Sequence, residues 1–337
     1  MKVILRIIFG ILGGVVMTSC VSTVSEPETS HTPIQFGTSV SRAAVNTADD
    51  LSSFSVWGGY ENVSLFDGTE VSKTSDGWTY EGGTRYWVPG KTFNFYAVYP
   101  SGKATSEDSG QTLKVSDFQC PRSFEELSEV TDLMTAYNSV NATVNQGPVD
   151  LMFKHALTRV NLAVKLADDI PAGYKVDILF LNFGAFTKGN MTLSLNTQSP
   201  IPEWTVDNTS FQVFSFSGTG GTLVNHTDIT ASGGQNVSVD ITPEEYDMYF
   251  IPQTIQEKGQ NMKIRYVLKN DKPETDPGYR YIENEIEIPL YNASITKWNP
   301  GDYITYTVTI SRYNVTVVLN VGDWEDGNLG NENIDFE

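Results

Sequence analysis

Apolar and polar residues alternate with a period of two through most of the chain beyond residue 34. The clearest segments, in which every second side chain is apolar, are residues 91–99, 158–166, 280–290, 302–310 and 314–321. This alternation predicts antiparallel strands with one face buried and the other in water. Asn161 and Ala163, for example, fall on the predicted solvent face of residues 158–166. Only Ser311-Arg312-Tyr313 joins the last two segments, which suits a hairpin.

Glycine, proline and aspartate separate these segments, as in Asp67-Gly68, Gly82-Gly83 and Asp276-Pro277-Gly278. Such pairs favour tight turns between strands. No long stretch has the period of 3.6 residues that an amphipathic helix requires. The capping-box pattern at Ser123–Glu126 begins so short a run that we expect only a crossover turn there. The sequence therefore predicts an all-β protein.

A turn motif that contains tryptophan occurs twice, as Trp87-Val-Pro-Gly90 and as Trp298-Asn-Pro-Gly301. Each copy precedes a predicted strand; Pro-Gly favours a tight turn, and the tryptophan can cover the start of the strand. Together with the length of 337 residues, this repeat predicts two β-sandwich domains. Gln146-Gly-Pro-Val-Asp150 interrupts two apolar runs, so we expect domains at 34–150 and 151–337.

The N-terminus has the organisation of an export signal. After a positively charged start, an apolar run extends from Ile7 to Met17, and Cys20 follows a small residue. So short a run suits a signal peptide better than a membrane span. The segment resembles a bacterial lipobox, which predicts a lipoprotein signal peptide at 1–19 and acylation of Cys20; an ordinary cleaved signal with an incidental cysteine is the alternative. Residues 20–33 are polar and contain proline, so we expect a flexible tether.

The chain is strongly acidic, with a formal net charge of −19. This charge repels polyphosphates, so we expect no nucleic acid partner. Cys120 is the only cysteine outside the targeting segment, so no intramolecular disulfide can form in the mature chain. We expect Cys120 to be a small, unreactive thiol.

No constellation of catalytic or metal-binding residues emerges. His31, His155 and His226 are far apart in sequence, and no cysteine–histidine cluster suits zinc. No local motif gives His155 an orienting carboxylate or a nucleophile, so we interpret it as a partly buried structural residue. The 6 tryptophans are dispersed, which is more typical of core positions than of a carbohydrate platform. The sequence predicts no enzymatic activity, no metal and no cofactor.

Short motifs follow one another in a fixed order: the lipobox at Cys20, Ile34-Gln-Phe36, Ser41-Arg-Ala43, Tyr86-Trp-Val-Pro89, Phe95–Pro100, Asp132–Ala136, Leu151–Val160, Phe250–Thr254, Trp298–Tyr303 and Val321–Trp324. Taken together they resemble the fimbrillins of Bacteroidales, the subunits of type V pili, over nearly the whole chain from Cys20 onward. The resemblance implies a lipoprotein precursor with two tandem transthyretin-like antiparallel β-sandwich domains. It also implies export to the outer membrane and the cell surface.

The resemblance further implies that an arginine-specific protease cleaves between Arg42 and Ala43. Cleavage would remove the strand within residues 34–42, whose apolar residues are Ile34, Phe36 and Val40. Before removal, this plug strand would complete the N-terminal sandwich and keep its edge covered; afterwards, a strand from a neighbouring subunit would fill the groove. Two alternatives stay open: Arg42 is an ordinary exposed loop residue, or the chain resembles the pilus anchors of the family, which keep the N-terminal strand and the lipid.

The family's donor strand comes from the C-terminal end, where this chain has two candidates. The first is residues 315–321, with alternating Val315, Val317, Leu319 and Val321; the second is residues 331–337, with alternating Ile334 and Phe336. The longer segment buries more apolar surface, whereas the tail can leave its domain at a smaller cost. We expect a combined element in which both segments pair with the neighbouring subunit.

Two functions are compatible with this sequence. The leading one is a structural pilus subunit that assembles with other subunits by proteolysis-triggered donor-strand exchange and serves cell adhesion. The alternative is a surface-tethered binding lipoprotein, such as a tip adhesin or an anchor, that recognises a host glycan or protein. Its binding loops would include residues 203–221 or 101–110. A secreted hydrolase has no residue constellation to support it.

Overall fold

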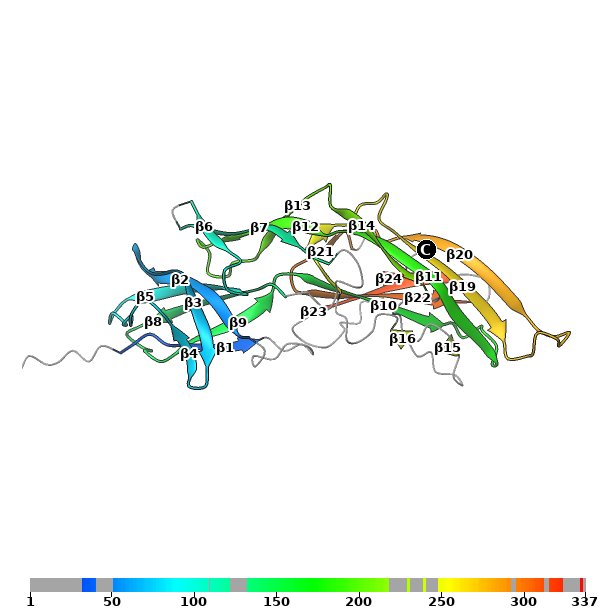
Figure 1. Cartoon of the computed structure of the whole chain (residues 1–337), viewed down its shortest axis with the longest axis horizontal. Coiled ribbons are helices and arrows are strands. Elements are labelled where there is room, and N and C mark those ends of the chain that lie inside the picture. The colour runs from blue at the N-terminus through cyan, green and yellow to red at the C-terminus, as the bar shows by residue number, and fades with distance from the viewer. Residues whose placement is uncertain are drawn as a thin grey trace, which may run out of the picture.

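The computed structural model describes residues 32–40, 51–108, 110–121, 132–217, 229–230, 239–240, 248–291, 295–311, 315–323 and 334–335. These residues form strands, turns and loops but no α-helix, which confirms the predicted all-β class. Nothing in the described residues is therefore a helix long and apolar enough to cross a membrane. The molecule is elongated, with the N-terminal part of the chain at one end and the C-terminal part at the other (Figure 1).

Two sheets form the N-terminal half. The first has seven strands in the order β1 (Phe36–Val40), β9 (Val149–His155), β8 (Met134–Asn141), β5 (Thr92–Tyr99), β2 (Ser53–Tyr60), β3 (Val63–Thr74) and β4 (Gly77–Tyr80). Its neighbouring strands are antiparallel, except that β1 and β9 are parallel. The second sheet has the order β13 (Glu203–Val206), β12 (Lys188–Ser194), β7 (Thr112–Gln119) and β6 (Thr105–Glu107).

A six-stranded and a five-stranded sheet face each other in the C-terminal half. One has the order β16 (Val239–Asp240), β10 (Thr158–Leu166), β22 (Asp302–Ile310), β23 (Val315–Asp323) and β24 (Ile334–Asp335), and β17 (Met248–Phe250) also pairs with β10. The other has the order β14 (Phe211–Ser217), β11 (Tyr174–Phe186), β19 (Asn261–Asn270) and β20 (Tyr281–Pro289), and β15 (Ile229–Thr230) pairs with β11. A short pair links β18 (Gln253–Thr254) to β21 (Lys297–Trp298).

The buried apolar side chains form three clusters. The N-terminal core lies on one face of the seven-stranded sheet and includes Phe54, Phe66 and Phe95. The junction core lies between the other face of that sheet and the four-stranded sheet; it includes Trp57 and continues to Tyr249 of the C-terminal half. The C-terminal core fills the space between the six-stranded and the five-stranded sheets. The junction core therefore packs the two halves of the chain against each other.

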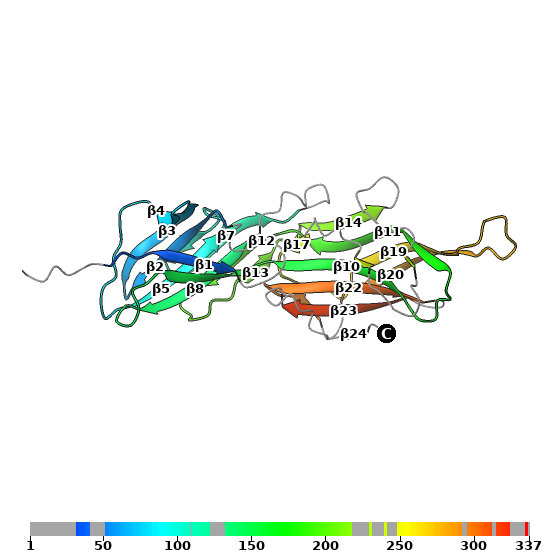
Figure 2. The ribbon, with the colours of Figure 1, turned by 90° about the horizontal axis from the view of Figure 1, so that it is seen from below.

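The five predicted strands correspond to β5, β10, β20, β22 and β23. The predicted hairpin is confirmed, because β22 and β23 are antiparallel from Asp302 opposite Asp323 to Ile310 opposite Val315. Figure 2 shows β10, β22 and β23 side by side in that order.

The prediction of antiparallel strands holds only in part for β10. This strand is antiparallel to β16 and β17 but runs parallel to β22. The predicted solvent face of β10 is also buried: Asn161 is 8% exposed and Ala163 0%. The physical reason is the central position of β10 in the sheet: side chains of the strands on both sides cover its small side chains, even where the sequence alternates. β5 behaves alike, since Tyr96 and Val98 pack into the junction core on its second face.

The two halves share strands across the predicted division at residue 150. β9 belongs to the N-terminal sheet, and the chain enters the C-terminal half only after Ala156-Leu157. β12 and β13 follow β11 in sequence, yet β12 pairs with β7 of the N-terminal half. Strands from both sides of residue 150 are thus needed to bury the junction core.

The repeated tryptophan motif has the same geometry in both halves. Trp87 lies in the N-terminal core and Trp298 in the C-terminal core, each 1% exposed. The glycines Gly90 and Gly301 have φ of 82° and 80°. In each turn the residue after the glycine donates its N–H to the carbonyl before the proline, at 3.3 Å in the first copy and 3.2 Å in the second. This positive φ at the third turn position is the reason for glycine there.

Candidate functional site at strand β1

The candidate site is the groove that holds β1, an edge strand of the seven-stranded sheet. Its first wall is β9, with which β1 pairs. The two strands run parallel from Phe36 opposite Val149 to Val40 opposite Phe153. Val149 also donates its N–H to the carbonyl of Gln35 at 2.7 Å. β1 and β9 lie together at the edge of the N-terminal half in Figure 1. The partners are more than a hundred residues apart, so no local sequence pattern indicates this pairing.

The second wall is the segment after β4, residues 80–87. The N–H of Ile34 donates to the carbonyl of Arg85 at 2.8 Å, and the N–H of Trp87 donates to the carbonyl of Thr32 at 3.0 Å. The hydroxyl of Tyr80 donates to the carbonyl of Ile34 at 2.9 Å. Residues 32–36 therefore lie in a groove between β9 and residues 80–87.

Two apolar side chains of this segment enter the N-terminal core. Ile34 is 1% exposed and Phe36 6%. The ring of Phe36 makes edge contacts with four aromatic rings, those of Phe54, Phe66, Tyr80 and Phe95, at centroid distances of 5.3 to 6.3 Å. Burying each anchor stabilises the fold by about 1.5–3 kcal/mol, so the pair contributes roughly 3–6 kcal/mol. β1 is therefore an important part of the core and not a surface strand.

The second wall has supports that do not involve β1. The Arg85 side chain donates from Nε to the carbonyl of Leu65 at 2.6 Å. Its guanidinium also lies over the rings of Phe66 and Tyr80, with Cζ 4.5 Å and 5.1 Å from their centroids. Such cation–π contacts, together with the hydrogen bond, fix the wall to β3 and β4. The sequence gives Arg85 no distinguishing signal; Tyr86-Trp-Val-Pro89 is the nearest motif.

Several predicted site residues lie outside the described residues, namely Cys20, Arg42, Ala43 and Phe336. Both donor candidates are in the six-stranded sheet: Val315, Val317, Leu319 and Val321 lie on β23, and Ile334 lies on β24. β23 pairs with β22 on one side and with β24 on the other, where Leu319 is opposite Ile334. Val321 packs against the C-terminal core. The two candidates are thus adjacent strands at one edge of the sheet.

The structure gives His155 a carboxylate partner that the sequence did not reveal. His155 Nδ1 lies 2.5 Å from Asp132 Oδ2, and the two side chains are 3% and 2% exposed. The chain approaches this point at the start of β8 and the end of β9, so only the pairing of these strands brings the residues together. A pair this deeply buried is out of reach of a substrate in bulk solvent. In the described residues, no group of histidine, cysteine and carboxylate side chains could hold a metal ion.

Other titratable groups of the junction core are also shielded from water. Cys120 is fully buried, and burial raises the pKa of its thiol well above the ordinary range. The thiolate is therefore suppressed, which agrees with the expected unreactive thiol. Burial, and to a smaller extent the neighbouring Tyr137, raises the pKa of Tyr96 to about 12.

Comparison with known proteins yields one sequence family and a set of similar folds. A model described as fimbrillin-like matches residues 38–324. The crystal structure of a fimbrial protein from Bacteroides vulgatus is similar over 86% of this chain and 99% of that chain, at 19% identity and a TM-score of 0.60. A candidate cell adhesion protein from Bacteroides uniformis aligns over 89% of this chain and 100% of that chain, at 15% identity and a TM-score of 0.42. No curated protein matches the chain.

Proposed function

Because the chain belongs to the fimbrillin-like family, we propose that it is a structural subunit of a cell-surface pilus and serves cell adhesion. The observation that carries this proposal is the way in which β1 and the residues before it are buried in their groove. Ile34, just before β1, and Phe36 of β1 fill the N-terminal core, and Arg85 supports the opposite wall without β1. A groove of this kind suits exchange of one strand for another.

In the proposed mechanism the precursor is exported as a lipoprotein through Cys20 and attached to the outer membrane. Cleavage by an arginine-specific protease after Arg42 separates β1 from the rest of the chain. β1 then leaves, and the groove between β9 and residues 80–87 is open to solvent. Exposing the aromatic rings around Phe36 is unfavourable, so the groove favours capture of a strand from a neighbouring subunit.

The C-terminal strands are the proposed donor. β24 is an edge strand of two residues and leaves its sheet at small cost, whereas β23 pairs with β22 along nine residues. Release of β24 alone therefore precedes release of β23. The donated element then includes the apolar positions of both strands, with Leu319 and Ile334 adjacent before exchange.

Replacing Arg42 tests the mechanism. We expect Arg42→Ala to give a folded precursor that stays monomeric on the cell surface, because β1 remains in its groove. Arg280→Ala, an exposed arginine in the turn before β20, is the matched control and is expected to polymerise normally. The measurement is the ladder of polymers on a denaturing gel without boiling. Polymers of normal length from Arg42→Ala would rule out this cleavage as the trigger.

A surface-tethered binding lipoprotein, at a pilus tip or as an anchor, is the second candidate. It is favoured by an open groove beside residues 203–208. These residues belong to the region 203–221 that was expected to be a binding loop, in which the structure has the strands β13 and β14. Neither candidate requires a catalytic centre. An acylated Cys20 on the mature, surface-exposed protein supports the anchor, whereas a mature N-terminus at Ala43 supports the polymerising subunit.

A further inference from the structure

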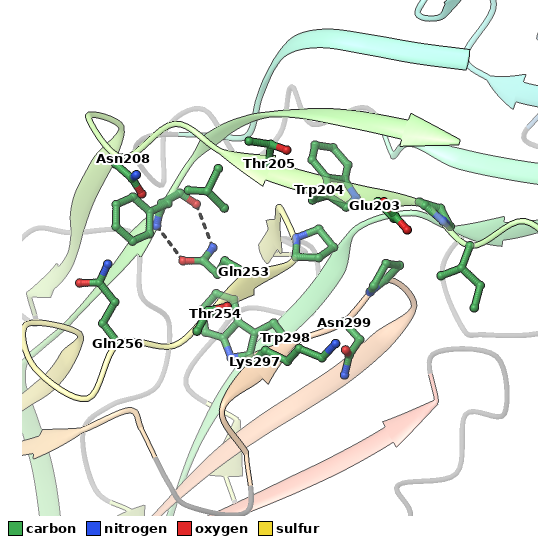
Figure 3. A pocket seen from close by; sticks show the side chains of 16 residues that line it. Glu203, Trp204, Thr205, Asn208, Gln253, Thr254, Gln256, Lys297, Trp298 and Asn299 are labelled. Carbon is green, nitrogen blue, oxygen red and sulfur yellow. Dashed lines mark hydrogen bonds between the residues drawn. The ribbon is translucent and has the colours of Figure 1, made fainter. Parts of the chain in front are cut away.

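An open groove of about 930 Å³ lies where the two halves of the molecule meet. One rim is β13 with the residues that follow it, and the other is formed by residues 252–256 and 297–300 (Figure 3). This volume is within the range of small-ligand sites, roughly 300–1,000 Å³, which often occur at the junction of two packed units. None of the assembly strands described above lines it, so the groove needs an explanation of its own.

Trp204 is a fixed aromatic surface on the first rim. Its Nε1–H donates to the carbonyl of Ala156 at 2.9 Å, and its ring meets that of Phe118 edge to face, with centroids 5.7 Å apart. The side chain is only partly buried and lines the groove. A ring held by two contacts can meet a ligand without losing further conformational freedom. Trp298 also borders the groove, but it is fully buried and bonded to Tyr306, so it has no free face to offer.

The floor of the groove is rigid because Gln253 uses its whole amide within the protein. Its Oε1 accepts from the N–H of Phe186 at 3.0 Å, and its Nε2 donates to the carbonyls of Phe186 and Ile251, both at 3.0 Å. The Nε2 of Gln260 donates to the same Oε1 at 3.1 Å. Figure 3 shows the two bonds between Gln253 and Phe186 as dashed lines. Ligand recognition therefore falls to the rims and not to the floor.

The rims carry polar side chains that donate hydrogen bonds, that accept them, or that do both. The exposed ones are Glu203, Thr205, Asn208, Thr254, Gln256 and Lys297. They supply amide and hydroxyl groups that both donate and accept, on both sides of the groove. Among the described residues that line the groove, the charged ones are one carboxylate, Glu203, and one ammonium, Lys297, so their charges balance.

We propose that this groove binds a neutral oligosaccharide. The apolar C–H face of a sugar ring packs on the face of a tryptophan, and its hydroxyls both donate and accept, as the rims require. The balanced lining in a strongly acidic chain does not favour an anionic ligand. β13 has only four residues and follows Pro202, so it offers few backbone hydrogen bonds to an extended peptide. This inference rests on the proposed adhesive role but not on strand exchange.

Titration of the purified full-length chain with maltotriose, cellotriose and N,N′-diacetylchitobiose tests the proposal. Tryptophan emission and saturation-transfer NMR report binding, and we expect at least one saccharide to give a saturable change in both. Gln256→Ala removes one polar side chain from the second rim, and because Gln256 bonds to Gln260 through its backbone N–H, that contact stays. We expect about a tenfold loss of affinity from this variant. Trp204→Phe should remove the emission change while the circular dichroism spectrum stays that of the parent.

Asn62→Ala is the control, because Asn62 is exposed and lines a separate cavity in the N-terminal half. It should bind as tightly as the parent. Each of four results would overturn the proposal: no saturable change with any neutral saccharide, equal weakening by Asn62→Ala and Gln256→Ala, tighter binding of trigalacturonate, or displacement of the sugar by a synthetic peptide of residues 315–323. Gln256→Ala should polymerise normally, so a loss of sugar binding can be told apart from a loss of polymer assembly.

Discussion

Phe36→Ala removes the largest side chain of β1 from the N-terminal core, and we expect it to lower the free energy of unfolding by about 3–5 kcal/mol. The side chain is 6% exposed, and its ring touches four other aromatic rings. Backbone hydrogen bonds such as that from Ile34 to Arg85 hold the segments around this core together, so they can move little to fill the void. A typical domain has a total stability of only about 5–15 kcal/mol.

Urea unfolding followed by tryptophan emission measures this change, because Trp87 packs against Phe93 and Phe95 in the same core. Gln35→Ala is the first control; the residue is exposed, so its replacement should change the free energy of unfolding by less than about 0.5 kcal/mol. Phe183→Ala is the second control, since Phe183 is equally buried but lies in the C-terminal core.

Release of the N-terminal peptide after proteolysis at Arg42 separates the two phenylalanine variants. A loss of 3 kcal/mol in the binding of β1 corresponds to roughly a hundredfold higher population of the open groove. Phe36→Ala should therefore lose the peptide much faster than the parent, whereas Phe183→Ala should not. A change in unfolding free energy below about 1 kcal/mol for Phe36→Ala, or equal release from both variants, would refute the idea that this ring holds β1 in place.

Three further outcomes are expected. Cys20→Ala should leave the chain unacylated and absent from the outer membrane fraction, as judged by metabolic labelling with a radioactive fatty acid; normal attachment would contradict the lipoprotein prediction. Truncation after Gly327, or aspartate at both Val317 and Leu319, should shorten polymers on a non-boiled gel, and normal lengths from both variants would remove the C-terminal strands as donors. The pKa of Tyr96 is raised to about 12 in the folded protein, against about 10 in the unfolded chain, so the contribution of Tyr96 to the free energy of unfolding is complete below pH 10 and is lost as the pH rises towards 12. Tyr96→Phe should flatten that part of the curve of unfolding free energy against pH, and an unchanged slope would show that the tyrosine does not titrate there.

The local elements of this protein follow from the sequence. Alternation located β5, β10, β20, β22 and β23, and the short connection between the last two predicted their hairpin. The Trp-x-Pro-Gly motif predicted a turn that both halves form with a positive φ at glycine. These features depend on residues close together in the chain, where side-chain period and backbone preference act directly. The order of family motifs likewise identified the type of protein.

Only the tertiary structure decided which strands meet. The parallel pairing of β1 with β9, the parallel pairing of β10 with β22, and the return of β12 to β7 all join residues distant in sequence. Alternation says that a strand has an apolar face, but many partners and both directions would bury that face equally well. The same limit applies to the sites: the His155–Asp132 pair, the second wall at Arg85 and the groove beside Trp204 each combine groups from segments that are distant in sequence. Their positions depend on how the three cores pack together, and that is a property of the whole chain.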